Sequence, residues 1–218
     1  MCSSDLNIAI GQCALYSSYG CEHFSNIAIG TKSLKYNRTG KYNLAIGSFG
    51  PMYFSRYSSY NIAIGRNALR SDLCSSFNIG IGDSVNYAGN LTGCGNIGIG
   101  RFANKCLSAG SCNISIGLGA NFNLKTGCNN IAIGAASLYA NSAGSNNIAL
   151  GLSAGASITT GAGNVIFGSY GGSASLACTF VVQAGNCQRI KVDGGGLCIN
   201  GSLFASVVAG SASLDSYN

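Results

Sequence analysis

One short apolar motif returns along the chain at nearly constant intervals. The pattern Asn-Ile-Ala-Ile-Gly, with conservative changes, occurs ten times, at spacings of 19, 17, 18, 17 and 18 residues followed by four of 17. Its leading asparagines are Asn7, Asn26, Asn43, Asn61, Asn78, Asn96, Asn113, Asn130, Asn147 and Asn164. Its closing glycines are Gly11, Gly30, Gly47, Gly65, Gly82, Gly100, Gly117, Gly134, Gly151 and Gly168. A sequence this regular folds as a stack of equivalent units, each in contact with its neighbours.

The length of the repeat identifies the kind of stack. Helical-pair repeats need about 33 residues or more and leucine-rich repeats about 20 to 29. The sequence therefore predicts an all-β fold, a parallel β-solenoid of about ten 17–18-residue coils within residues 1–172. In each coil the motif forms a strand and glycine turns the corner. A returning segment then brings an apolar residue such as Leu34 or Leu69, eight positions after the asparagine.

The alternation of side chains along a strand leads to a first assignment of the two faces. The first and third residues after asparagine, such as Ile8 and Ile10, share one face, which we assign to the core. The residue between them is Ala, Gly or Ser in every copy except the last, where it is Ile166. We assign this small position to the outside, where it would let another copy of the chain approach closely. We therefore expect a homotrimer around a threefold axis.

The two invariant residues of the motif receive structural roles. Asparagine at one place in every coil is expected to stack into an amide ladder that satisfies side-chain and backbone groups. Glycine at the corner supplies a positive φ angle or a close backbone approach, which other residues resist.

Composition excludes several classes of partner. Charged residues make up 8% of the chain, and 12 basic residues against 6 acidic ones give a net charge of +6 without a basic run. We therefore predict no nucleic-acid partner. No apolar run approaches the roughly 20 residues of a membrane span, so no membrane insertion is expected. The opening Met-Cys-Ser-Ser-Asp-Leu-Asn has neither the basic nor the apolar part of a secretory signal, which fits assembly inside a cell.

The repeat stops after Gly168. Strand-like pieces begin at Cys178, Arg189 and Leu197 and are separated by glycine-containing turns. We predict that residues 173–218 form a small C-terminal β cap or module with a loose serine-rich tail.

The sequence offers little material for catalysis or cofactor binding. The single histidine is His23, beside Cys21 and Glu22, and neighbours in an extended chain point to opposite faces. The six acidic residues are scattered. There is no Cys-x-x-Cys pair for zinc, and the fingerprint-like glycines near Gly98 are repeat positions. We therefore predict no enzyme, no cofactor and no metal site.

Three of the eleven cysteines could meet along the stack. Cys94, Cys112 and Cys128 lie two, one and two residues before successive repeat asparagines. On neighbouring coils they would be about 5 Å apart, within the range that a disulfide tolerates. This spacing allows two alternatives. The cysteines form disulfides along the rod or between chains, or they stay free thiols in a reducing compartment.

Aromatic residues concentrate in the variable segments of the first coils, together with arginines. Tyrosine and arginine on an outer face are typical of a glycan or protein receptor site. The candidate receptor contacts are Tyr36, Arg38, Tyr53, Arg56 and Tyr57. The alternative is that these rings form packing ladders between coils.

The ten motif copies resemble two groups of repeat proteins. They are similar to the head repeats of trimeric autotransporter adhesins, left-handed parallel β-rolls with an Ala-Ile-Gly signature. They are at least as similar to the Asn-Thr-Ala-Val-Gly…Ala-Leu repeats of tail-fibre proteins from phages and large viruses. In the latter an Arg-Ile-Asp…Gly-Asn-Val-Gly-Ile-Gly segment often follows the repeats. It is echoed here by Arg189, Ile190, Val192, Asp193, Gly194, Leu197 and Ile199.

The resemblance implies a structural fibre at a virion surface. Such a homotrimer would contact other virion proteins and a host cell-surface glycan or protein. The alternative is the head of a bacterial surface adhesin, although the period is longer than in typical heads and neither a coiled-coil stalk nor a membrane anchor follows in this sequence. A third alternative is an ice-binding solenoid. Such a protein would carry regular rows of threonine on a flat face, whereas these strands carry Ala and Ile.

Overall fold

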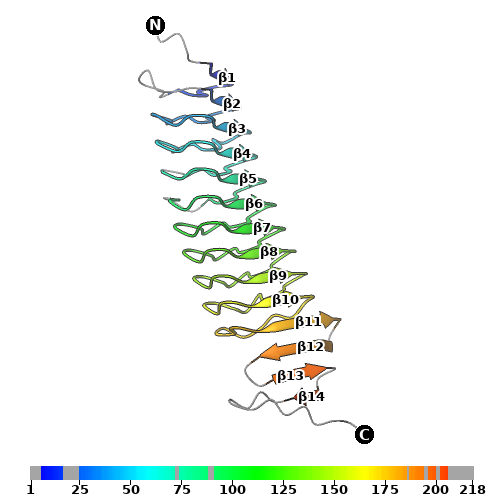
Figure 1. Cartoon of the computed structure of the whole chain (residues 1–218). Helices are drawn as coiled ribbons and strands as arrows, with labels where there is room; N and C mark the ends of the chain where they lie inside the picture. Colours follow the sequence, from blue (N-terminus) through cyan, green and yellow to red (C-terminus); the bar gives the residue numbers. More distant parts are fainter. Residues whose placement is uncertain are drawn as a thin grey trace.

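A computed structural model describes residues 6–16, 25–71, 74–87, 91–185, 187–193, 196–199 and 202–205. Within these residues the fold is all-β and contains no helix. Fourteen strands form one sheet, and their order in space is their order along the chain. Figure 1 shows the strands stacked like rungs from the N-terminal to the C-terminal end. The predicted β-solenoid of about ten turns is confirmed.

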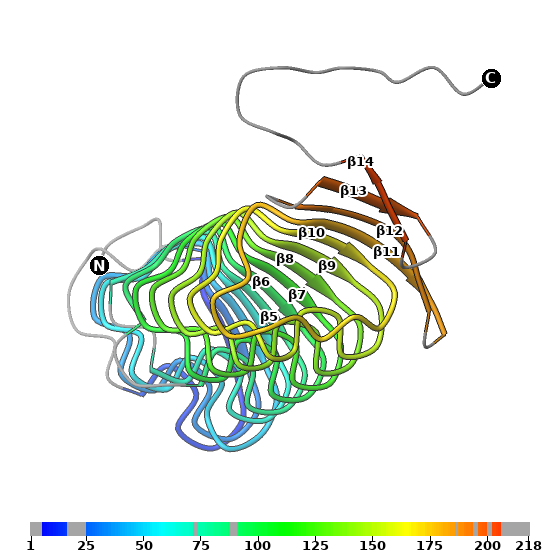
Figure 2. The same cartoon turned by 90° about the horizontal axis from the view of Figure 1, so that it is seen from below.

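Ten three-residue strands are the copies of the repeat motif. They are β1 (Ile8–Ile10), β2 (Ile27–Ile29), β3 (Leu44–Ile46), β4 (Ile62–Ile64), β5 (Ile79–Ile81), β6 (Ile97–Ile99), β7 (Ile114–Ile116), β8 (Ile131–Ile133), β9 (Ile148–Leu150) and β10 (Val165–Phe167). Each pairs in parallel with the next, and equivalent residues lie opposite each other, as Ile114 does with Ile131. Seen along the stack in Figure 2, the turn segments follow one another on the side away from the strands.

The coil geometry continues beyond residue 172. Strand β11 (Phe180–Ala184) pairs in parallel with β10, and the backbone N–H of Thr179 donates to Asn164 Oδ1 at 3.1 Å, in the place of the next asparagine. The antiparallel part begins at β12 (Cys187–Asp193) and continues through β13 (Gly196–Ile199) and β14 (Ser202–Ala205). Strands are present at all three strand-like pieces that the sequence indicated after Gly168.

The assignment of the two strand faces was wrong. From β2 to β10 the middle residues point into the coil and are buried, as Ala28, Ala63 and Ala132 are at 0% exposure. The flanking isoleucines face outward and are half-buried or exposed, at 58% for Ile10 in the first strand and 39% for Ile133 in the eighth. The reason is the small volume of the coil: leucines of the returning segment, among them Leu138, already fill it. Large residues on the strand therefore fit only outside.

Residue sizes inside the coils compensate for one another. The last motif copy has Ile166 in the small position, and it is fully buried because the coil before it has Gly155 at the position where the coil before that has Leu138. A Cβ atom on Gly155 would come within 2.7 Å of Leu138 Cδ2 and 3.4 Å of Ile166 Cδ1. A small residue beside a large one is expected where side chains are close-packed. This arrangement supports the assignment of the middle strand residues to the interior of the coil.

The corner glycines are required by backbone packing as well as by conformation. Their φ angles lie between +103° at Gly168 and +142° at Gly47. A Cβ atom on Gly117 would lie 2.7 Å from the carbonyl oxygen of Gly134 in the next coil. Neither condition allows a larger residue without a shift of the backbone.

Candidate functional site

The repeat asparagines form a buried column of hydrogen bonds that runs the length of the solenoid. The Oδ1 atom of each accepts the backbone N–H of the next, at 2.9 Å from Asn26 to Asn7 and at 3.1 Å from Asn164 to Asn147. The amide nitrogen also donates within its own coil, as Asn130 Nδ2 does to the Gly144 carbonyl oxygen at 2.8 Å. Each side chain therefore closes one coil and joins it to the following one.

A second group of buried polar residues lies inside the middle coils, where Asn104 and Asn121 stand at the position that carries leucine in other coils. Ser115 Oγ donates to Asn104 Oδ1, and Asn121 Nδ2 donates to Ser115 Oγ, both at 2.7 Å. These residues are fully buried. In these coils leucine moves to a later position of the returning segment, at Leu107 and Leu124, so that a mixed interior is still filled.

The outward isoleucines make a continuous apolar surface, which we call the isoleucine face. It consists of the first and third residues of strands β1 to β10, all of them Ile, Leu, Val or Phe and none of them charged. Over the described residues no segment covers it fully, since these side chains stay half-buried or exposed throughout. Strands about 4.8 Å apart make this face on the order of 50 Å long.

An aromatic stack lies beside the start of three strands. Tyr42, Tyr60 and Phe77 each precede a repeat asparagine, and their ring centroids are 4.9 and 5.1 Å apart with nearly parallel planes. They are 49%, 51% and 62% exposed. The stack therefore extends the apolar surface along the edge of the strands in coils two to four.

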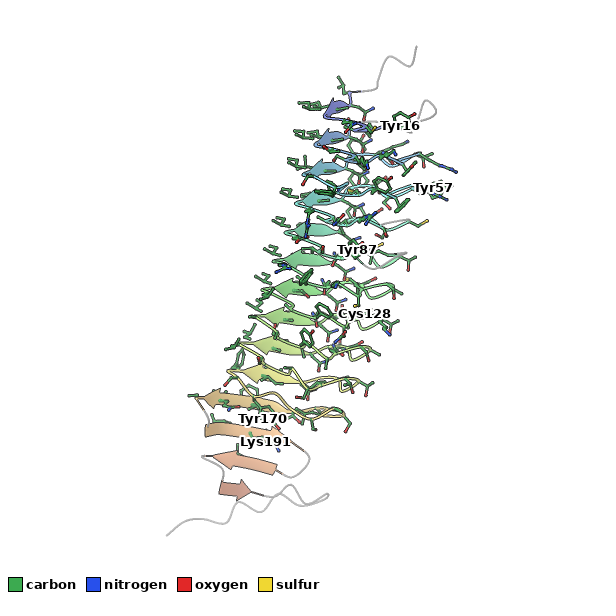
Figure 3. The ribbon with its side chains drawn as sticks, turned by 180° about the vertical axis from the view of Figure 1, so that it is seen from behind. Tyr16, Tyr57, Tyr87, Cys128, Tyr170 and Lys191 are labelled. Carbon is green, nitrogen blue, oxygen red and sulfur yellow. The ribbon has the colours of Figure 1, made fainter. Side chains whose placement is uncertain are left out.

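The five candidate receptor residues all lie in the turn segments of the second and third coils, where two contacts join the coils. Tyr36 and Tyr53 pack edge to face, with ring centroids 5.0 Å apart, which is the ladder that the alternative reading described. Arg38, Arg56 and Tyr57 are exposed, and the backbone N–H of Arg38 donates to the Arg56 carbonyl oxygen at 3.1 Å. Figure 3 shows Tyr57 on the turn side of the ribbon, as it does Tyr16 and Tyr87.

Sequence reasoning missed the cations that stand between these rings. Lys35 Nζ lies 4.8 Å from the Tyr36 ring centroid and 5.6 Å from that of Tyr53. Hydrogen bonding to Tyr36 raises the pKa of Lys35, and hydrogen bonding to Tyr53 and Lys35 lowers the pKa of Tyr36. The signal was present in the repeat: Lys35 stands nine residues after its asparagine, where Arg70 and Lys105 also stand.

One acidic side chain in the turns is paired. Arg66 Nη2 lies 2.7 Å from Asp83 Oδ2 in the next coil, and Arg101 Nε approaches the same oxygen at 3.9 Å. Hydrogen bonding to Arg66 holds the pKa of Asp83 below its ordinary value. The pair joins two coils at the surface.

Cys94, Cys112 and Cys128 are free thiols in the structure. Cys128 lies two residues before its asparagine, at the position of Ser111 and Ser145 in the neighbouring coils, and its Sγ accepts the Ser111 N–H at 3.4 Å. Ser111 separates it from Cys94, whose N–H donates to Ser111 Oγ at 3.1 Å. Cys112 lies one position later, with its Sγ beside Gly95. The offset of one residue therefore places Cys112 in a different column from the other two.

Cys21, Glu22 and His23 lie outside the described residues. Where the chain is described, no three potential metal ligands come together, and no helix is long and apolar enough to cross a membrane.

Comparisons with known proteins add no relative. The sequence matches no protein-family profile, and neither a curated protein nor a solved structure matches it.

Proposed function

We propose that this chain is the structural subunit of a virus or phage fibre, an elongated homotrimeric β-solenoid that attaches the particle to a host-surface glycan or protein. The observation that carries the proposal is the isoleucine face on a rod-shaped stack. An elongated rod can extend from the particle surface, and the isoleucine face can join chains into a trimer.

The isoleucine face favours association because of its size and uniformity. Two residues per strand over ten strands present a strip on the order of 500 Å², at the upper end of what a monomer usually exposes. With the adjoining rings of Tyr42, Tyr60 and Phe77, the strip approaches the roughly 800 Å² per partner of a stable interface. Because the strip lies on one side of a straight stack, copies in parallel can bury it around one axis.

The interior of the solenoid supports a role in which length and stiffness matter. Every coil is joined to the next by backbone bonds and by the asparagine column, so bending the rod would strain buried hydrogen bonds. A thin stack of small coils has little core of its own. Burying the isoleucine face between chains would add to the apolar surface that each chain buries by itself.

Measurement of the mass in solution tests the proposal. We expect the full chain to have three times its 22.0 kDa chain mass. Ile131→Lys on the outward face should lower the mass to that of one chain while the β-sheet circular dichroism is retained. Thr126→Lys, at an exposed turn position, should leave the trimer intact. A monodisperse monomer of the unmodified chain would contradict the proposal.

A further inference from the structure

A column of alternating rings and cations runs along the turn side of the first five coils. Tyr16, Lys35, Tyr53, Arg70 and Tyr87 occupy equivalent places, one in each coil. Lys35 Nζ lies 5.6 Å from the ring centroids of both Tyr16 and Tyr53. The Arg70 guanidinium lies 5.5 Å from the Tyr53 ring and 5.7 Å from that of Tyr87. Each cation therefore sits between two rings.

The same position continues the pattern in the next three coils. Lys105 Nζ lies 5.0 Å from the Phe122 ring centroid and 4.7 Å from that of Phe102. Phe122 stacks on Tyr139 with centroids 4.9 Å apart. Lys105, like Lys35 and Arg70, is half-buried along the surface. We call the whole set, from Tyr16 to Tyr139, the cation column.

Positive charge is concentrated on the part of the rod that carries the cation column. Between Lys32 and Lys125 the sequence contains ten basic residues and two acidic ones, Asp72 and Asp83. Residues 126–188 contain no charged residue at all. Asp83 is already engaged by Arg66. A long negatively charged ligand would therefore meet one end of the rod and not the other.

We propose that the cation column binds a linear acidic polysaccharide lying along the rod, with its carboxylates at Lys35, Arg70 and Lys105. This inference deepens the proposed function, on which it rests, by naming the class of surface ligand. The three cations recur in every second coil, at intervals of roughly 9.6 Å. A regular anionic polymer can match such a spacing at several points at once, which raises its affinity through multivalency.

The rings hold the cations in place. A cation between two aromatic faces gains attraction from both and has less freedom to move, so less entropy is lost when the ligand binds. Arg70 is further fixed by its hydrogen bond from Nη1 to the Tyr87 hydroxyl oxygen at 2.9 Å.

The same geometry argues against single-stranded nucleic acid. Proteins that bind single strands offer aromatic faces on which bases stack. Here the faces of Tyr53 and Phe122 are occupied by neighbouring cations and rings along the column. What the column offers a ligand is positive charge, which suits the carboxylates of an acidic sugar polymer.

Binding of defined polymers to the full chain tests the inference. The probes are hyaluronan, with one carboxylate per disaccharide, and alginate, with one per sugar; neutral dextran and single-stranded poly-dA serve as comparisons. We expect at least one acidic polysaccharide to bind and dextran not to. Lys35→Met, Arg70→Met and Lys105→Met should each weaken binding about fivefold, since each removes one charge contact of about 1 kcal/mol. The triple variant should lose binding.

Lys125→Met is the matched control, because this lysine is exposed and lies outside the cation column. It should change the affinity less than twofold. The inference is overturned if neither acidic polysaccharide binds, if the triple variant binds as well as the unmodified chain, or if poly-dA binds as tightly as the polysaccharides. The variants keep the apolar stems of the side chains, and circular dichroism checks that they fold.

The outcome is separable from that of the proposed function. The cation column and the isoleucine face are on different parts of each coil, so the mass of every variant can be measured beside its binding. A monomeric chain that binds the polysaccharide would contradict the trimeric fibre and leave the ligand assignment standing. A trimer that binds neither acidic polysaccharide would contradict the ligand assignment and leave the trimeric fibre standing.

Discussion

The two faces of the repeat strands differ in a way that hydrophobicity alone does not reveal. The inward face carries the smallest residues, and Ala132 is completely buried. The outward face carries the largest ones, and Ile133 is 39% exposed. In a coil of 17 residues the interior is filled by the returning segment, so the available volume decides which residues face it. Under the proposed function, the outward isoleucines make the contact between chains.

The difference predicts that inward positions decide whether a chain folds and outward positions decide whether chains associate. The largest effect is expected at the asparagine column. Asn130→Ala removes the acceptor of the Asn147 N–H and the donor to the Gly144 carbonyl oxygen, both buried. At roughly 1 to 3 kcal/mol for each unsatisfied group, the free energy of unfolding should fall by about 3 kcal/mol or more.

Chemical denaturation measures this change. Asn123→Ala is the control, because Asn123 is half-buried on the turn surface, and it should shift the free energy of unfolding by less than about 0.5 kcal/mol. Equal effects at the two asparagines would show that the buried column does not hold the coils together.

The second comparison concerns two glycines. Gly117→Ala places a Cβ atom against the Gly134 backbone at a φ of +132°, whereas a Cβ on Gly171 meets nothing closer than Ser157 Oγ at 3.6 Å. We expect Gly117→Ala to cost about 1 to 3 kcal/mol of folding free energy and Gly171→Ala to be nearly neutral. Thermal unfolding of both variants measures the difference, and a neutral Gly117→Ala would mean that the corners are not closely stacked.

The third comparison places the same side chain on the two faces of β8. Ala132→Leu overpacks a position that is surrounded by Leu138 and Ala149 and should destabilise the fold by about 1 to 3 kcal/mol. Ile131→Leu conserves volume on the outside and should cost less than about 0.5 kcal/mol. Denaturation of both variants measures these costs. If Ile131→Leu were the more harmful change, the assignment of the faces would be reversed.

The smallest effect is expected at the surface pair of Arg66 and Asp83. Because the folded state lowers the pKa of Asp83 from its ordinary value of 3.8, the pair stabilises the fold above that pH, and the stabilisation disappears as the pH falls through the lowered value. Asp83→Asn should lower the melting temperature by no more than about 2 °C at pH 7. The difference between the two proteins should shrink as the pH is lowered below 3.8, which thermal scans over a series of pH values can check.

The repeat period was sufficient to predict the solenoid, the parallel order of the strands and the burial of Leu34, Leu69 and Leu138, because a fixed period leaves few ways to stack equal units. It was not sufficient to assign the faces. Alternation separates two faces of a strand without saying which one the rest of the coil covers.

The cation column was hidden for a different reason. Lys35, Arg70 and Lys105 are far apart in sequence and stand among variable residues, so each looks like an isolated surface charge. Only their common offset of nine residues from the repeat asparagine brings them into one line. The cysteine spacing suggested a contact between coils. A difference of one residue in the distance to the repeat asparagine places Cys112 in another column than Cys94 and Cys128.

Photocrosslinking tests most directly the claim that the outward face joins chains. A photoreactive amino acid would replace Ile131 in one sample and the exposed turn residue Thr126 in another. After illumination, denaturing electrophoresis should show bands at two and three chain masses for position 131 and a single-chain band for position 126. A single-chain band from position 131 would contradict the claim.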